Sequence, residues 1–512
     1  MKKNIVKTFL FMFSAIFLAK ILGLVRNIVF ANFYGTGLEA TAFFTASRIP
    51  LQLLDMSLGA AISSTFIPIF NELLQKKGKD ESIKFANNFL NIIIIISLVL
   101  TVLGMIFAPA VVKVIAPNLD ESTFTLTVQL IRILFPILLF TAVAYVFVGF
   151  LQSLDEFNIP AIISVVANGL LILYLVVFNN KFGIQGVAVA MLIGWGTQIL
   201  VQLPAVIKKG FKYNLSVNFK DESILKVVRL ALPILISTWV QPINNIVNIR
   251  LASGLEDGQA ISAIEYSYNL YLIIVGVFSY TLSNIIFPEL SKLTADNDSE
   301  NTKSLLNRSV KISLLFIIPM SVGIALLSNE IVKVIYQRGE FTEHSTLLTG
   351  GALFFYAFGM IGYGLMEILN KAFYAMQDSK TPMYISGFSI ILNVILSVVL
   401  VKTMGYKGLP LSASITSIIT AILMLYIVNN KKPGVIENQS FMELAKIIIS
   451  AVAMGFVIWV IKSVIVSSTI ICLVASVLIG IIVYFICTFI LKSETVMMGI
   501  DMVKNRKNEN SL

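Results

Sequence analysis

Two basic residues near the amino terminus lie inside an otherwise apolar segment. Lys20 and Arg26 flank Gly23, and Asn27 follows directly. On a helix Lys20 and Asn27 share a face, Arg26 lies about 9 Å farther along the axis than Lys20, and Gly23 permits a bend or a close helix contact. A charge at membrane depth usually faces protein or water. The segment therefore predicts a cationic cavity for an anion, with phosphate held by the planar fork of arginine and the point charge of lysine.

Later apolar segments carry further polar residues. Arg48 and Asp55 lie in the second segment and Asn269 in the eighth, and we predict that they contribute to the same substrate-binding cavity. For Arg48, the alternative is that its side chain reaches the membrane interface. For asparagine at membrane depth, the alternative is a hydrogen bond between helices. The candidates for a gating or ion-related role are Asn248, Glu265 and Asn393.

The chain offers little material for metal, redox or catalytic chemistry. It has two cysteines and one histidine, which exclude a disulfide framework, a thiolate metal site and an imidazole cluster. A membrane glycosyltransferase or polymerase would need catalytic carboxylates or a nucleotide site, and the sequence contains neither a P-loop nor a paired-acid motif. We therefore expect no enzymatic activity, no cofactor and no metal. The net charge of +10 is scattered through short loops, which favours an anionic leaflet over nucleic acid as its partner.

The composition is that of a protein surrounded by lipid. Hydrophobic residues make up 57% of the 512 residues and charged residues 13%, whereas about a quarter of a soluble domain is charged. Windows of about 20 apolar residues predict an all-α polytopic membrane protein with about fourteen transmembrane helices. The expected spans lie near 8–30, 40–73, 85–116, 124–152, 157–178, 185–207, 224–251, 260–289, 309–336, 346–375, 381–402, 408–429, 441–462 and 468–491.

The sequence also resembles itself at a spacing of about 220 residues. Gly183-Ile-Gln-Gly186 returns as Gly405-Tyr-Lys-Gly408, and the proline of Asp155-Glu-Phe-Asn-Ile-Pro160 returns at Pro382. Chance recurrence is the alternative to duplication. We predict an N-lobe of helices 1–6 (1–215), a C-lobe of helices 7–12 (216–433), and two extra helices with a cytoplasmic tail (434–512). Two six-helix repeats with the same entry side follow the parallel-repeat plan of many carriers.

Loop charge predicts the orientation of the chain. Lysine and arginine concentrate in alternate loops, including 76–84, 208–220, 292–311 and 431–432, and again in the tail. By the positive-inside rule these segments are cytoplasmic. Both termini are therefore expected on the cytoplasmic side.

Four stretches of the chain match a known pattern. Lys20-Ile-Leu-Gly-Leu-Val-Arg26-Asn27 is similar to a first-helix signature Ser-Arg-x-Leu-Gly-x-x-Arg-Asp, and Tyr374-Ala-Met-Gln-Asp-Ser-Lys-Thr-Pro382 to Phe-Tyr-x-x-x-Asp-x-Lys-Thr-Pro. Arg48-Ile-Pro50 and Gln337-Arg-Gly-Glu-Phe-Thr342 fit as well. The chain thus resembles the MurJ (MviN) lipid II flippase family, as a divergent member of the MOP (multidrug/oligosaccharidyl-lipid/polysaccharide) exporter superfamily.

The resemblance implies a function. An undecaprenyl-pyrophosphate-linked glycan precursor, lipid II or a related cell-wall or capsule intermediate, would move from the inner to the outer leaflet by alternating access. It also implies a bacterial cytoplasmic membrane, a role in peptidoglycan biosynthesis and cell shape, a groove for the lipid tail at helices 13 and 14, and cell-wall synthesis proteins as candidate partners. Lys20 and Arg26 take the places of two family arginines. The positions where charged residues of the family are replaced are Thr41, Leu54, Gly59, Asn248 and Asn269.

Two other functions compete with this one. A MATE-like drug or cation antiporter shares the two-lobe plan, but it would use an acidic residue in the first helix, where this chain has two cations. A degenerate, non-transporting family member would fit the missing arginines. For a flippase, an inside-negative potential would favour expelling the anion, at about 2.3 kcal/mol per charge per 100 mV. The neutral side chains of Asn248 and Asn393 argue against sodium coupling.

Overall fold

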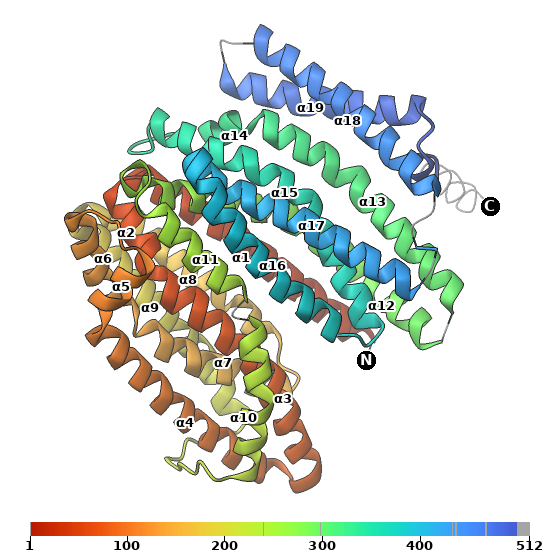
Figure 1. Cartoon of the computed structure of the whole chain (residues 1–512). Helices are drawn as coiled ribbons and strands as arrows, with labels where there is room; N and C mark the ends of the chain where they lie inside the picture. Colours follow the sequence, from red (N-terminus) through yellow and green to blue (C-terminus); the bar gives the residue numbers. More distant parts are fainter. Residues whose placement is uncertain are drawn as a thin grey trace. The chain divides into compact units, whose positions relative to one another are not determined.

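The computed structural model describes residues 2–238, 240–296, 298–432, 434–435, 438–465 and 468–498 (Figure 1). All regular secondary structure in these ranges is helical. The chain forms two compact units. Unit 1 comprises Met1–Ser262 together with Arg338–Phe341, and unit 2 comprises Ala263–Gln337 and Thr342–Leu512. These units are defined by packing, and the lobe boundaries at 215 and 433 stay a prediction about the sequence repeat.

Unit 1 holds the thirteen described helical segments that precede α12, and the start of α12. Helices α3, α4 and α7 pack together, α8 packs against both α1 and α9, and α2 packs against α6. The bounds are α1 (Lys2–Tyr34), α2 (Leu38–Ser47), the π-helix η1 (Arg48–Asp55), α3 (Met56–Lys77), α4 (Lys79–Ile106), α5 (Ala108–Ile115), α6 (Glu121–Leu134), α7 (Ile137–Ser153), α8 (Asn158–Val177), α9 (Asn179–Lys208), α10 (Glu222–Thr238), α11 (Val240–Ala252) and the 3-10 turn η2 (Glu256–Gly258).

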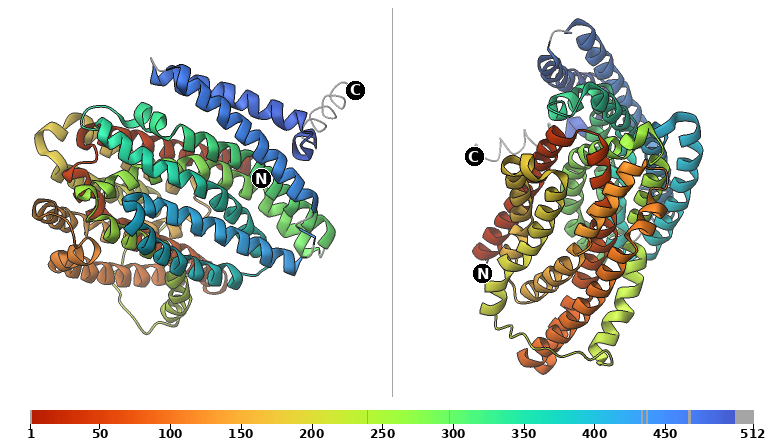
Figure 2. Two further views of the ribbon diagram at one scale, coloured as in Figure 1. Left: turned by 45° about the horizontal axis from the view of Figure 1, so that its top comes forward. Right: turned by 90° about the vertical axis from the view of Figure 1, so that its left-hand side faces the viewer.

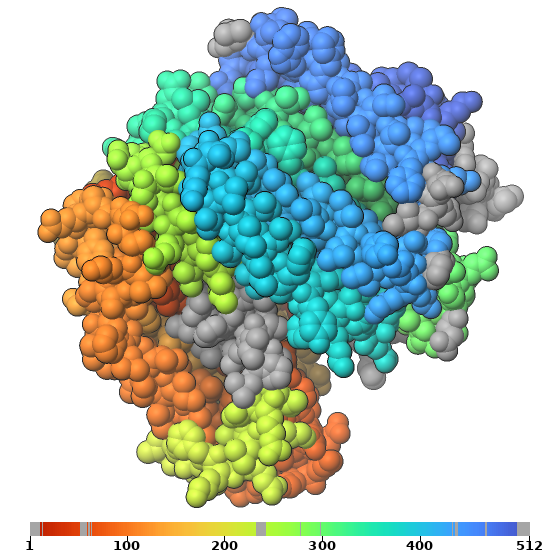
Figure 3. All heavy atoms as spheres, viewed as in Figure 1, coloured from red at the N-terminus to blue at the C-terminus, as the bar shows by residue number. Residues whose placement is uncertain are grey.

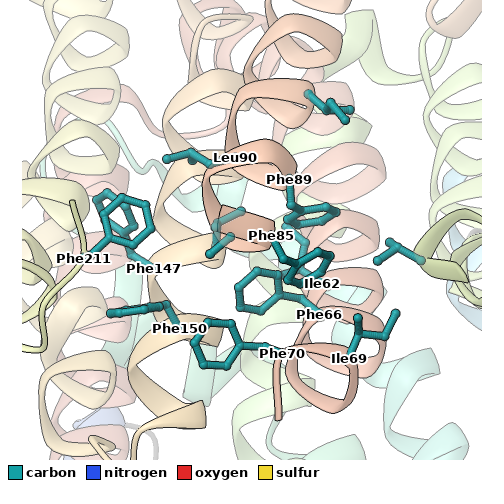
Figure 4. Packing of buried hydrophobic residues seen from close by; sticks show 14 of the residues in the cluster. Ile62, Phe66, Ile69, Phe70, Phe85, Phe89, Leu90, Phe147, Phe150 and Phe211 are labelled. Atoms are coloured by element: carbon teal, nitrogen blue, oxygen red, sulfur yellow. The ribbon is translucent and has the colours of Figure 1, made fainter. Parts of the chain in front are cut away.

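A phenylalanine-rich cluster forms the core between α3, α4 and α7 (Figure 4). Phe66 and Phe70 of α3 are fully buried, and Phe66 lies 5.4 Å from Phe85 and 5.3 Å from Phe89, centroid to centroid, on α4. Phe150 of α7 meets Phe70 edge to face at 5.5 Å. Such aromatic packing gives van der Waals contact where lipid removes the hydrophobic advantage of burial.

Unit 2 contains the remaining helices, and α15 packs against both α13 and α17. The bounds are α12 (Gln259–Ala295), α13 (Ser299–Leu326), α14 (Ser328–Tyr336), α15 (Glu343–Ala375), α16 (Lys380–Met404), the 3-10 turn η3 (Gly405–Lys407), α17 (Gly408–Lys431), α18 (Asn438–Val464) and α19 (Thr469–Ile490). The two helices outside the repeat, α18 and α19, lie side by side, and α18 packs along α13 (Figure 2). The Tyr484 hydroxyl of α19 donates to the Leu315 carbonyl of α13 at 2.6 Å.

The sequence repeat has a structural counterpart at two helix ends. Gly183 (φ 56°, ψ −154°) and Gly405 (φ 60°, ψ −143°) adopt nearly the same left-handed conformation, which glycine accepts without strain. Asp155 (φ 61°) and Gln377 (φ 57°) form a second pair. After each of these two residues, the next N–H bonds a carbonyl five residues back at 2.9 Å, a helix-ending motif. The repeated turns are therefore conserved in shape between the two halves of the chain.

The all-helical membrane fold is confirmed, whereas the expected count of fourteen spans is not confirmed. Within the described residues, eleven segments are long and apolar enough to cross a membrane, and one of them, Lys380–Lys431, covers two expected spans. The expected spans at 40–73 and 224–251 are not among the eleven. The first is divided into α2, η1 and α3, and the second into α10 and α11. Hydropathy measures apolarity and does not detect such breaks.

Candidate functional site

Arg26 is the predicted cation with the most developed surroundings. It lies on α1 where α1 packs against α8, and its side chain is half-buried. Its Nη1 donates to Oδ1 of Asn168 at 3.0 Å, and its Nε and Nη2 donate to Oδ1 of Asn27 at 3.3 and 3.1 Å. Both of these partners are neutral amides. These two amides orient the guanidinium and add no charge of their own, which suits a group that binds an anion.

Asn168 was not among the residues predicted from the sequence. It is an amide in the expected span 157–178, and its Nδ2 donates to the Ser164 carbonyl one turn earlier at 2.9 Å. That bond leaves Oδ1 directed to Arg26. A polar residue in an apolar span was the available signal, since such residues are rare and face protein or water.

Space is open beside Gly23, between the two cations of α1. A Cβ atom added to Gly23 would meet no atom of the described residues within 4 Å. The glycine therefore makes no close helix contact, in contrast to one of the two roles expected for it, and α1 continues through it as a helix. Lys20 lies one turn earlier with an exposed side chain. Its role in the site stays a prediction.

Arg48 and Asp55 are the first and last residues of the π-helix η1. Pro50, inside this segment, cannot donate a backbone hydrogen bond and clashes with the preceding turn, which accounts for a wider helix here. Single-turn π-helices occur often at functional sites. The Arg48 side chain is buried, with 8% of its surface exposed, so the alternative in which it reaches the membrane interface is disfavoured. The side chain of Asp55 lies outside the described residues.

The gating candidates lie on three helices. Asn248 is on α11 in unit 1, and its Oδ1 is buried with no hydrogen-bond partner among the described residues. On α12 in unit 2, Nδ2 of Asn269 donates to Oε1 of the buried Glu265 at 3.3 Å. Asn393 is buried in α16. Within single units, the structure thus brings together Arg26 with Asn27 and Glu265 with Asn269.

The middle of the Gln337–Thr342 motif, Arg338–Phe341, forms a loop that packs within unit 1 against the end of α1. The N–H of Glu340 donates to the Asn32 carbonyl at 2.9 Å. Gly35 and Gly339 both have positive φ, and a Cβ on either would lie 2.2 Å from a backbone oxygen of the other segment. Only glycine fits both requirements, which explains the glycine in this motif.

Asp378, in the Tyr374–Pro382 motif, caps α16 outside the membrane spans. It accepts hydrogen bonds from the Thr381 N–H at 3.0 Å and hydroxyl at 2.6 Å, and it pairs with Lys431 of α17. Burial acts to raise the pKa of Asp378, but the hydrogen bonds from Lys431 and Thr381 outweigh it and lower this pKa to about 2. The motif therefore ties the start of α16 to the end of α17.

Known structures define the class of protein. A MATE-family multidrug transporter of the MOP superfamily, in an inward-facing conformation, superposes with a TM-score of 0.69 at 14% identity, covering 83% of this chain and 98% of that one. At this identity the likeness concerns the fold alone. The protein is thus a multi-pass helical membrane protein with the fold of the MOP superfamily.

Closer similarities define the family. A structure of lipid II flippase MurJ in an inward closed conformation matches with a TM-score of 0.83 and 27% identity, over 95% of this chain and 99% of that one. Probable lipid II flippases MurJ of Buchnera aphidicola (28% over 462 residues, 90% of each chain) and Rickettsia prowazekii (29% over 452 residues, 87% and 88%) are similar in sequence. The family model "Lipid II flippase MurJ" matches residues 30–478. The chain belongs to the MurJ lipid II flippase family.

Proposed function

We propose that this protein moves a polyprenyl-pyrophosphate-linked glycan, lipid II or a related cell-wall intermediate, from the inner to the outer leaflet. The observation that carries the proposal is the likeness to lipid II flippase MurJ over 95% of the chain. Family membership favours this function over the MATE-like alternative. The name of the family describes transport, and the proposed cycle breaks no covalent bond.

Arg26 supplies the chemistry of the proposed cycle. Its guanidinium, oriented by Asn27 and Asn168, binds the pyrophosphate through charge-assisted hydrogen bonds. The open space beside Gly23 lets a phosphate approach the helix between Arg26 and Lys20. The glycan enters the cavity with the pyrophosphate while the polyprenyl tail stays in lipid, and α18 and α19 offer an apolar surface for the tail. Alternating access then exposes the site to the outer side.

The membrane potential is the proposed driving force. With both termini in the cytoplasm of a bacterial cell, an inside-negative potential favours outward movement of the anion and return of the empty cationic site. Dissipating the potential with valinomycin and potassium should slow transport, whereas replacing sodium by choline should leave the rate unchanged. A sodium requirement would contradict this part of the proposal.

Complementation tests the function. This chain replaces the essential lipid II flippase of a bacterial cell, as the native sequence and as Arg26→Ala and Lys20→Ala. We expect the native chain to rescue growth and both variants to fail. The matched control is Arg132→Ala on α6, because Arg132 is also an arginine of an expected span but is exposed and donates only its Nε to the Met105 carbonyl in the described contacts.

Four outcomes decide the proposal. Rescue by the native chain and by Arg132→Ala, but not by the α1 variants, supports it, provided that all variants reach the membrane in equal amounts. Rescue by Arg26→Ala overturns the role of Arg26. Failure of the native chain, with another polyprenyl lipid co-purifying, assigns a different cargo. Failure with no co-purifying lipid supports the non-transporting alternative.

A further inference from the structure

A segment of unit 1 between α9 and α10, Phe211–Phe219, exposes a row of large apolar side chains; we name it the strap. The alternate residues Tyr213, Leu215, Val217 and Phe219 are 60%, 77%, 42% and 54% exposed. The residues between them are polar and also exposed. The segment lies on the surface near the bottom of Figure 3, in yellow-green. A contiguous apolar row of this kind is unusual on a surface that faces water and marks a binding surface.

Three asparagines of α4 hold the strap in place. Asn87, Asn88 and Asn91 are each 5% exposed or less, and their side-chain amides bond the backbone of the strap as a neighbouring β-strand would. The bonds run from Asn87 Nδ2 to the Lys212 carbonyl (2.8 Å), from the Asn214 N–H to Asn87 Oδ1 (2.8 Å), from Asn88 Nδ2 to the Asn218 carbonyl (3.0 Å), from the Asn218 N–H to Asn88 Oδ1 (2.7 Å), and from Asn91 Nδ2 to the carbonyls of Asn214 and Ser216 (2.9 Å each).

These bonds are informative because a loop in water does not need them. Water satisfies the backbone groups of an exposed loop, whereas backbone that enters the edge of a bilayer must find partners in the protein. Six hydrogen bonds between three buried amides and the backbone of one short segment therefore indicate a place where water is scarce. The apolar row of the strap points to the same conclusion.

The position of the asparagines along α4 fixes the depth. Asn91 is followed directly by the run Ile92–Ile96, and Ile95 and Ile96 are 40% and 44% exposed, as expected for residues that face lipid. The asparagines thus lie where the apolar part of the span begins. A strap bonded to them runs at the level of the membrane interface, where tyrosine and other aromatic rings are enriched.

Lysines surround the strap. Lys208 and Lys209 precede it, Lys212 lies within it and Lys220 follows it. All of these lysines are exposed except Lys209, which is half-buried. Lys209 donates to the Leu154 carbonyl at 2.8 Å. A basic rim around an apolar row complements anionic lipid headgroups above acyl chains.

We propose that the strap is an interfacial membrane anchor. Leu215, Val217 and Phe219 insert into the boundary between headgroups and acyl chains, while Tyr213 stays at the boundary with its hydroxyl donating to Asn91 Oδ1 at 2.9 Å. The lysines bind anionic headgroups, and the asparagines of α4 satisfy the backbone of the strap. The segment that connects α9 to α10 would then be fixed to the bilayer surface instead of moving as a free linker. This inference goes beyond the proposed transport function and does not depend on it.

Spin-label accessibility tests the proposal on the full chain in vesicles of phosphatidylethanolamine and phosphatidylglycerol. A nitroxide is attached at Leu215→Cys in a Cys472→Ala, Cys487→Ala background, and its collisions with oxygen, which concentrates in lipid, are compared with those of a water-soluble nickel chelate. Val99→Cys on α4, a site 50% exposed in the apolar run, is the lipid control. Glu300→Cys, at the exposed start of α13, is the aqueous control.

We expect the label at 215 to resemble that at 99, with oxygen access several-fold above nickel access. A label at 215 that resembles the one at 300 would overturn the proposal, as would a site shielded from both reagents, which would indicate a protein partner. In vesicles of phosphatidylcholine alone, oxygen access at 215 should fall toward the aqueous value. An unchanged value there would exclude the role of the lysines.

Discussion

Two basic residues on membrane helices are positioned in different ways. Arg26 on α1 is oriented by the neutral amides of Asn27 and Asn168. Lys311 on α13 is buried, with 8% of its surface exposed, and pairs with the carboxylate of Glu494 at 2.8 Å. Around Lys311 the carboxyl-terminal region is rich in such contacts, since the buried Glu443 of α18 accepts hydrogen bonds from Ser493 and from the N–H groups of the next two residues.

The difference separates a cation that can serve a ligand from one that serves the fold. A buried charge that meets a carboxylate has its partner within the protein, and its loss weakens packing. The amide oxygens of Asn27 and Asn168 fix the orientation of the Arg26 guanidinium, so its planar fork is already positioned for an incoming phosphate. This comparison predicts that changes around Arg26 alter transport and that changes around Lys311 alter stability.

Asn168→Asp should break the comparison most strongly, because it replaces the amide that accepts a hydrogen bond from Arg26 with a carboxylate, the group that Lys311 pairs with. The new charge competes with pyrophosphate, and we expect transport to fall about 30-fold or more, on the scale of about 2 kcal/mol for a buried charge pair. The measurement is the appearance of lipid II in the outer leaflet of cells that depend on this chain. Thermal stability should be unchanged or higher.

Asn168→Ala is the matched variant, since it removes the hydrogen bond to Arg26 and adds no charge. Its effect should be clearly smaller than that of Asn168→Asp. Equal losses in the two variants would show that orientation matters and net charge does not.

Glu443→Gln should produce the largest change in the carboxyl-terminal region. The substitution weakens three hydrogen bonds to a buried carboxylate that is 2% exposed, and bonds to charged groups contribute about 2 kcal/mol each. We expect a loss of about 2 kcal/mol, seen as a lower unfolding temperature in detergent, with transport per folded molecule retained. Glu494→Gln, at a carboxylate 38% exposed, should cost less. A variant that stays stable and loses transport would contradict the assignment of this region to the fold.

Gly23→Leu tests the open space between Lys20 and Arg26. Because a Cβ there meets nothing within 4 Å, the fold should tolerate leucine, but the side chain would occupy the path of the phosphate to Arg26. We expect about a tenfold loss of transport, which corresponds to about 1.4 kcal/mol, with the unfolding temperature unchanged. Gly387→Leu on α16 is the control, since its Cβ also meets open space. Equal losses in both variants would mean that bulk alone explains the effect.

Much of the fold could be predicted from the sequence, and the reason is visible in α8 and α19. Each is one uninterrupted helix through an apolar run that matches an expected span, so hydropathy suffices to find it. The expected span at 40–73 fails this test, because Pro50 and the polar ends of η1 divide it. The repeat could also be found, since Gly183 and Gly405 are required by the same backbone turn.

The surroundings of the site were only partly predictable. Arg26 and Asn27 stand out in the sequence because they are adjacent polar residues in an apolar segment. Asn168 is separated from Arg26 by 142 positions, and only the packing of α1 against α8 brings them together. The same holds for Lys311 and Glu494, 183 positions apart. Long-range polar pairs depend on tertiary structure, and no local pattern specifies them.

Asp378→Asn should have the smallest effect, because Asp378 lies outside the spans and its partner Lys431, at the end of a span, is 44% exposed. An exposed pair contributes below about 1 kcal/mol. The pKa of Asp378 is lowered from 3.8 to about 2, so the folded protein favours the carboxylate. The stabilisation is therefore fully present above pH 3.8 and is lost as the pH falls through 2.

Unfolding temperatures of native protein and variant, measured in detergent, should differ by a constant amount at neutral pH and converge below pH 3.8. A difference between the two unfolding temperatures that widens on acidification would mean that Asp378 is not held as a carboxylate. In that case Lys431, unlike Lys311, would not be a cation paired with a charged carboxylate.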